Sequence, residues 1–404
     1  MTALAAPAEA PFPTWPRSVA AAAVLVALGA WAWSLSAGDA ESRAQSFSLL
    51  AGVAFGIVLQ RSRFCFLCNF RDFLDKRDPR GLLSILVALA AGFVLYQVVI
   101  LAWMPVPAEG RLPPNAHIGP VSPVLALAAL VFGLGMAVSG SCLSAHLYRL
   151  GEGSPTSPFA LVGAALGFVA GFFTWNTLYL GIISEWPATW LPHQLGYVGT
   201  AAVTLAVLAV LAAIVLALAR PQPQEPAGGE SSPFRDALRR VFVARWPAVT
   251  GGVLVGVIAM AAYFRVEPLG VTAELGSLAR TAANHGGILP DTLYGLDGLS
   301  GCATAVKEAI LSTNGLFVVG LVGGSFAAAL VAGQFRPAVP TSGQVVRGLA
   351  GGVLMGWGAM TALGCTIGVL LSGIHAGALA GWVFLVACTA GIWLGLTAMR
   401  WLAR

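Results

Sequence analysis

Residues 133–142 read GLGMAVSGSC, and residues 356–365 read GWGAMTALGC. In both stretches a Gly-x-Gly stands at the same distance before a cysteine, and a small residue directly precedes that cysteine. A second similarity has an offset of 200 residues, because 52–64 and 252–264 share a Gly-Val pair, a later Gly and a final Phe. Two similarities in the same order along the chain indicate an internal duplication.

The composition indicates a helical membrane protein with many spans. The 404 residues are 57% hydrophobic and 10% charged, whereas soluble domains carry about 25% charged residues. Gly and Ala are abundant, as close helix packing in lipid favours. The six cysteines form neither a disulfide framework nor a paired zinc spacing. We therefore expect no globular catalytic domain and no nucleic-acid partner, and we predict an all-α fold.

Ten apolar runs are long enough, or nearly so, to cross a bilayer. They are Ser18–Ala37, Phe47–Gln60, Leu82–Trp103, Pro123–Gly140, Phe159–Gly181, Gly196–Ala219, Ala248–Phe264, Gly315–Gly333, Gly348–Leu363 and Ala376–Met399. The resulting division is a disordered tail (1–17), an extra helix (18–44), a first repeat with a connecting span (45–219), a cytoplasmic linker (220–246) and a second repeat (247–404).

The distribution of basic residues predicts the orientation. With both termini in the cytoplasm, 17 of the 22 Lys and Arg residues fall on the cytoplasmic side, as the positive-inside rule requires. The two repeats then cross the membrane in opposite directions. Inverted repeats are typical of transporters, whose binding site lies at the repeat interface. We expect a multi-pass membrane protein with both termini in the cytoplasm.

Four apolar segments are too short or too rich in Gly to span, and we predict that they form re-entrant half-helices. These segments are Phe64–Phe70, Leu143–Gly153, Gly298–Ser312 and Thr366–Gly373. Free N–H groups and a partial positive charge at the N-terminus of such a helix suit an anion.

Cysteines stand at or near the start of these segments. The candidate pathway residues are Cys65, Cys142, Cys302 and Cys365, together with Arg63, Ser141 and Gly364. A buried cysteine often acts as a small hydrophobic residue, and this interpretation fits Cys388 in the last span. Cys68 forms Cys-x-x-Cys with Cys65, but the surroundings are not thioredoxin-like. Lys307 could face the same cavity, with Glu308 as a competing partner.

The motifs 59–65 (LQRSRFC), 139–142 (SGSC), 299–302 (LSGC) and 363–365 (LGC) resemble those of the YeeE/YedE family of bacterial sulfur-transport membrane proteins. The resemblance covers about residues 45–400. It implies thiosulfate uptake and an hourglass fold in which helical loops meet at a constriction lined by cysteines, with roles for Cys65, Cys142 and Cys365. A related branch is tied to selenium metabolism, so selenium species remain alternative substrates.

Thiosulfate carries charged oxygens and a soft terminal sulfur, and thiols offer it weak S–H donors. An ordinary thiol pKa of about 8.5 leaves these donors neutral, and conduction needs weak sites in series. We therefore expect transport by a non-covalent relay, with no cofactor, no metal and no enzymatic activity. The alternative is a membrane thiol or persulfide enzyme with Cys65 as nucleophile. By resemblance, a cytoplasmic sulfur carrier or a rhodanese-type protein is a candidate partner.

Overall fold

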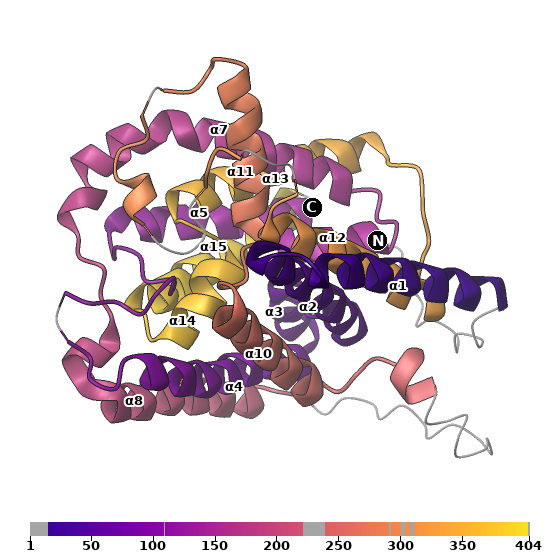
Figure 1. The fold of residues 1–404 in the computed structure, drawn as a ribbon, viewed down its shortest axis with the longest axis horizontal. Coiled ribbons are helices and arrows are strands. Elements are labelled where there is room, and N and C mark those ends of the chain that lie inside the picture. Colours follow the sequence, from indigo (N-terminus) through magenta and orange to yellow (C-terminus); the bar gives the residue numbers. More distant parts are fainter. Residues whose placement is uncertain are drawn as a thin grey trace.

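The computed structural model describes residues 15–108, 110–220, 239–290, 292–299, 304–307 and 311–402, and the secondary structure in these ranges is helical (Figure 1). The helices are α1 (Trp15–Ser36), α2 (Ala40–Ser62), α3 (Phe66–Lys76), α4 (Arg80–Trp103), α5 (Pro123–Ser139), α6 (Leu143–Gly151), α7 (Ser157–Gly181), α8 (Leu191–Ala217), α10 (Ala248–Arg265), α11 (Val271–His285), α12 (Thr313–Val331), α13 (Ser342–Thr361), α14 (Gly373–Ala376) and α15 (Leu379–Leu402). A π-helical segment, Thr366–Ser372, precedes α14.

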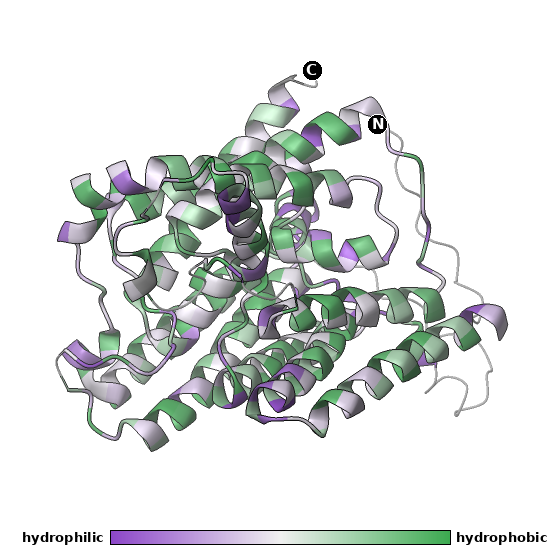
Figure 2. Cartoon of the chain, turned by 45° about the horizontal axis from the view of Figure 1, so that its top comes forward, coloured by the Kyte–Doolittle hydropathy of each residue, from purple (hydrophilic) through white to green (hydrophobic). Residues whose placement is uncertain are grey.

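The helices have the length and composition of membrane spans. Within the described ranges, nine spans are long and apolar enough to cross a bilayer, and a tenth results if α13 and the bent segment Thr366–Ala376 count as one. Figure 2 shows apolar residues along the long helices and polar residues mostly near their ends. The prediction of an all-α membrane protein with about ten spans is confirmed.

Two helices at the N-terminal end begin before the predicted boundaries. Helix α1 begins at Trp15, inside the predicted tail, because proline is tolerated in the first turn of a helix and Pro16 does not interrupt it. Helix α2 begins at Ala40 rather than near residue 45, because the Asp39 side chain caps it by accepting from the Ser42 N–H at 2.8 Å. Helix α1 lies at the edge of the molecule, against α2 and α12 (Figure 1).

Three of the four predicted half-helices are present, as α3, α6 and the π-helical segment. The fourth is predicted at Gly298–Ser312; its residues 304–307 are not helical, and 300–303 and 308–310 lie outside the described residues. The additional short helix is α11 instead, which is rich in Ala and carries Glu274 and Arg280. Because of these polar residues, a search for apolar segments does not find α11.

Glycines of the repeated motifs mark close helix crossings. A Cβ on Gly52 would lie 2.1 Å from the Phe317 carbonyl oxygen of α12, and a Cβ on Gly252 would lie 2.4 Å from the Ser84 carbonyl oxygen of α4. The glycines of the Gly-x-Gly motif also lie at close crossings, since Gly133 approaches α15 and Gly356 approaches α7 at similar distances. Small residues allow backbones to come this close. The repeated glycines therefore hold α2 to α12, α10 to α4, α5 to α15 and α13 to α7.

The same order of elements occurs twice. Helices α2 to α7 run as a long, a short, two long, a short and a long helix. Helices α10 to α15 follow the same order, with the π-helical segment and α14 as the second short element. Helix α8 connects the two halves. This order agrees with a duplicated chain, and the opposite orientation of the halves in a membrane stays a prediction.

The segments predicted to be cytoplasmic gather at one end of the helices. The Arg61 guanidinium donates to the carbonyls of Val243 and Ala244, and Arg400 pairs with Asp75. Two segments that are both predicted to lie on the opposite side of the membrane also meet each other, since the Tyr263 hydroxyl donates to the Pro114 carbonyl at 3.1 Å. These contacts are consistent with the prediction that successive loops lie on alternating sides of the membrane. The compartment that each side faces stays a prediction.

Candidate functional site: thiols at the ends of short helices

Cys65 lies where the chain breaks between α2 and α3. Arg63 takes a left-handed conformation with φ 51° and ends α2, because its N–H then bonds the Leu59 carbonyl. The extended Cys65 is the residue that precedes the first turn of α3. Its thiol is buried, with 1% of the residue exposed. The Arg63 side chain is exposed, so of the two predicted site residues only the cysteine lies inside the protein.

Cys142 occupies the same position before α6. Gly140 ends α5 with φ 88°, a conformation that favours glycine, and Cys142 directly precedes the first turn of α6. The thiol of Cys142 lies beside that of Cys65. The hydroxyl of Ser141, also buried, lies 4.0 Å from the Cys65 sulfur. The structure therefore brings together three of the predicted pathway residues from two helix ends.

Cys365 precedes the π-helical segment. Helix α13 stops at Thr361, and Gly364 follows with φ 149°, which a residue with a side chain rarely adopts. This turn directs the Cys365 sulfur into the protein, where it accepts from the Ile367 N–H at 3.4 Å. The role of Gly364 is conformational, because it supplies the turn and no side chain.

The thiol of Cys365 lies beside the hydroxyls of Ser144 and Thr272. Ser144 belongs to the first turn of α6, two residues after Cys142, and Thr272 belongs to the first turn of α11. A series of buried polar groups therefore runs from α11 through Cys365 and α6 to Cys65, in which the hydroxyls of Ser144 and Thr272 make no hydrogen bond within the described residues. The starts of four short helices meet along this series, and each contributes N–H groups that the helix itself leaves without a partner.

Cys68 extends the series. Cys68 is not among the pathway residues predicted from the sequence. It lies one turn after Cys65 on α3, and its thiol faces the thiol of Cys65. The Arg149 Nη2 atom donates to the Cys68 sulfur at 3.2 Å. The sequence contained a signal for Arg149, because it follows Cys142 by two helical turns and so falls on the same face of α6.

Lys307 and Glu274 form a buried ion pair beside the start of α11. Their side chains are 7% and 6% exposed, and Ser312 donates to the second carboxylate oxygen at 2.7 Å. The sequence interpretation considered Glu308 as the partner of Lys307, but residues 308–310 lie outside the described residues. Cys302, a predicted pathway residue, also lies outside them.

We interpret Cys388 and His146 as residues of the packed interior rather than of the site. Cys388 is fully buried on α15, at the crossing with Gly133 of α5. His146 hydrogen bonds with Ser139 and Ser157, both at 3.2 Å. In the described part of the chain, no three His, Cys, Asp or Glu side chains cluster in a way that could hold a metal ion.

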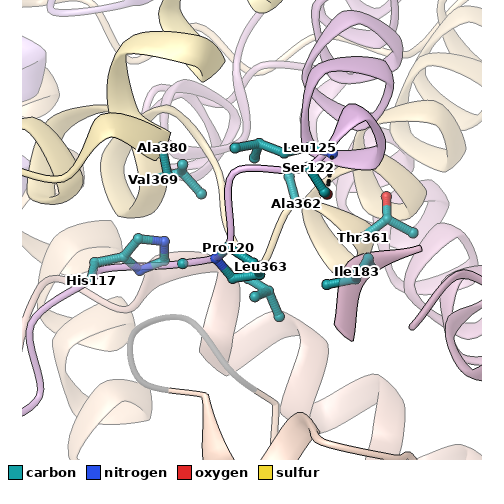
Figure 3. A pocket seen from close by; sticks show the side chains of 11 residues that line it. His117, Pro120, Ser122, Leu125, Ile183, Thr361, Ala362, Leu363, Val369 and Ala380 are labelled. Carbon is teal, nitrogen blue, oxygen red and sulfur yellow. Dashed lines mark hydrogen bonds between the residues drawn. The ribbon is translucent and has the colours of Figure 1, made fainter. Parts of the chain in front are cut away.

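A small cavity adjoins residues 361–363, just before Cys365 in the sequence, and Figure 3 shows the side chains that line it. Leu363 and Val369, on either side of Cys365 in the sequence, line it together with His117 and Thr361. His117 belongs to the loop between α4 and α5, and burial lowers its pKa to about 4. The cavity therefore adjoins the turn that positions Cys365, rather than the series of thiols itself.

The comparisons with known proteins now identify the family. The model of a family described as sulphur transport matches residues 61–394. The chain belongs to this family. The matched range includes all the helix ends that carry Cys65, Cys142 and Cys365.

Two named relatives match most of the chain, and a third matches about half of it. The thiosulfate transporter TsuA of Spirochaeta thermophila is 30% identical over 337 residues, which are 81% of this chain and 90% of that protein. The thiosulfate transporter TsuA of Escherichia coli is 28% identical over 85% of this chain and 92% of its own length. The probable transporter YedE of Escherichia coli is 35% identical over 48% of this chain and 45% of its own length.

Proposed function

We propose that this membrane protein takes up thiosulfate or a related small sulfur anion, and that it is a transporter rather than an enzyme. One observation carries the proposal: Cys65, Cys142 and Cys365 stand directly before three short helices and lie along one buried series of polar groups. Membership of the sulphur transport family and two relatives named as thiosulfate transporters support it.

The anion passes the thiols without covalent chemistry. Each S–H is a weak donor, and each helix start adds N–H groups and a partial positive charge. The terminal sulfur of thiosulfate is soft and bonds weakly to thiols, so no single contact retains it. Serial weak sites are what conduction requires. A thiolate would repel the anion, and a covalent adduct would stop transport.

The order of contacts and the predicted orientation support a direction of transport. Cys365 meets α6 through Ser144, and Cys142 meets Cys65. Beyond Cys65 the chain enters α3 and the predicted cytoplasmic end of the molecule. The anion therefore passes Cys365 first, then Cys142, then Cys65. In a bacterial inner membrane with both termini in the cytoplasm, this path leads inward to a soluble sulfur carrier or a rhodanese-type acceptor.

Uptake by the purified protein in liposomes tests the proposal. Thiosulfate, sulfite, sulfate and selenite are offered separately, and accumulation of each is measured against empty liposomes. We expect thiosulfate to enter and the Cys142→Ser and Cys365→Ser variants to transport at least about tenfold more slowly. Cys388→Ser is the matched control, because Cys388 is equally buried but lies in a helix crossing.

Two results would overturn the proposal. One is normal thiosulfate uptake by both serine variants, which would remove the thiols from the path. The other is a stable sulfur adduct on Cys65 in intact-protein mass spectrometry during turnover, which is the result expected of a persulfide enzyme.

A further inference from the structure

Neutral thiols cannot by themselves hold a dianion inside a protein. Moving an ion from water into an environment of low dielectric constant costs many kcal/mol unless an opposite charge or several hydrogen bonds compensate for it. The N–H groups at the helix starts compensate in part. A buried path for thiosulfate therefore needs a cation close to the thiols.

Arg149 provides that cation. Its guanidinium is partly buried and donates to the Cys68 sulfur at 3.2 Å. The buried phenol of the neighbouring Tyr148 also lies close to the guanidinium. Cys68 in turn faces Cys65. The guanidinium therefore lies at the end of the thiol series that is closest to the predicted cytoplasmic side.

The surroundings leave the charge of Arg149 available to a ligand. No described carboxylate lies within ion-pair distance of it, since the ion pairs among the described residues involve other side chains. Glu152, the acidic group one turn further along, accepts a hydrogen bond from Gln60 at 3.2 Å and acts on Arg149 only through its field. A thiol sulfur is a weak acceptor, so an anion with several oxygens is a better partner for the guanidinium than Cys68.

Neighbouring basic residues are less well placed. Arg61 donates to the backbone carbonyls of Val243 and Ala244, and Arg63 is exposed. Arg71, on α3, adds positive charge that acts on Cys68. Among these residues, Arg149 is the one with a direct hydrogen bond to a thiol of the series.

We propose that Arg149 and Cys68 form an inward binding subsite for the anion, an inference that rests on the proposed function. The planar guanidinium binds two oxygens of the thiosulfate sulfonate group, a geometry that a point charge such as Lys cannot reproduce. The thiols of Cys68 and Cys65 contact the terminal sulfur. The guanidinium therefore selects for an oxyanion, and the thiols select for its soft sulfur.

Binding and uptake measured on matched variants test the subsite. Thiosulfate binding is followed as the rise in melting temperature of the detergent-purified protein, and uptake in liposomes gives KM. We expect Arg149→Gln to raise KM about tenfold or more and to abolish the thermal shift, because a charge-assisted hydrogen bond is lost. Arg149→Lys keeps the positive charge, so its KM and its thermal shift should lie between those of the wild type and those of Arg149→Gln. Cys68→Ala should raise KM for thiosulfate but leave inhibition by sulfate unchanged.

Arg347→Gln is the control, because Arg347 is exposed at the same predicted side and should behave as the wild type. An unchanged KM with an unchanged thermal shift in Arg149→Gln overturns the subsite. If Arg149→Gln does not fold, an Arg149→Lys variant with wild-type KM and thermal shift overturns its bidentate role. If the wild-type protein binds thiosulfate but does not take it up, the proposed transport function is contradicted and the subsite is not.

Discussion

The hydroxyl of Ser144 lies beside the thiol of Cys365, although the two residues are 221 positions apart. Ser144 lies in the first turn of the short helix that follows Cys142, so this contact joins the second half of the chain to the short helix that carries Cys142 at its start. Cys142 and Cys65 form the next contact in the series. The two halves therefore share one polar interior, and the contacts within it can be tested chemically.

The contact between Cys65 and Cys142 predicts a short-range cross-link. A variant that keeps only these two cysteines should react with dibromobimane, which becomes fluorescent when it joins two neighbouring thiols. A variant that keeps only Cys65 and Cys388 should remain dark, because Cys388 lies on α15 at the crossing with α5. Equal fluorescence in the two variants, measured after denaturing electrophoresis, would contradict the arrangement of the thiols.

The histidine beside the cavity predicts a pH dependence of stability. His117 is 2% exposed and its pKa is lowered to about 4 by burial, whereas an unfolded chain binds the proton near pH 6.5. The unfolded state therefore holds more protons between these values, and the protein loses stability as the pH falls from about 6.5 to about 4. The loss attributable to this histidine is on the order of 3 kcal/mol.

Melting temperatures in detergent at pH 7.5 and pH 5 check this expectation. The His117→Gln variant should lose fewer degrees between the two pH values than the wild type, since glutamine has no proton to gain. His285→Gln is the control, because His285 is exposed at the end of α11. The same pH sensitivity in the His117→Gln variant and the wild type would show that His117 does not titrate as its burial requires.

Much of this architecture could be predicted from the sequence, because lipid imposes a simple requirement. Long apolar runs must be helical to satisfy their backbone groups, and short apolar segments that Gly interrupts must be enclosed by protein. The positions of Cys65, Cys142 and Cys365 before short helices follow from these two rules. The role of the three thiols in transport stays a prediction.

The contacts of Arg149 and Glu274 could not be predicted in the same way. Arg149 reaches Cys68 across 81 positions, and Glu274 reaches Lys307 across 33. Both depend on how short helices dock, which is decided by side-chain packing and not by a periodic pattern. Helix α11 was missed because its polar residues face the protein interior, where Lys307 and Ser312 satisfy Glu274.

The buried ion pair of Glu274 with Lys307 predicts a large cost when one partner is removed. Glu274→Gln leaves the buried ammonium without this carboxylate, which should destabilise the protein by about 3–5 kcal/mol. The double variant Glu274→Leu with Lys307→Met should recover most of that loss. Asp75→Asn, in the exposed pair with Arg400, should cost at most about 1 kcal/mol. Denaturation in detergent gives all three values, and equal costs for Glu274→Gln and Asp75→Asn would contradict the burial of the first pair.

The glycines of the duplicated motif predict that replacement by alanine destabilises the protein at a helix crossing but not at a glycine without close neighbours. Gly52→Ala places a methyl group 2.1 Å from the Phe317 carbonyl oxygen, so α2 and α12 must separate, at a cost of about 1–3 kcal/mol or more. Gly252→Ala should behave alike, because it meets the Ser84 carbonyl oxygen of α4 at 2.4 Å. Gly29→Ala on α1 meets no atom within 4 Å, and there alanine should leave stability unchanged or raise it, since it favours the helix. Melting curves of the three variants separate the two cases, and a stable Gly52→Ala protein would exclude backbone contact at this crossing.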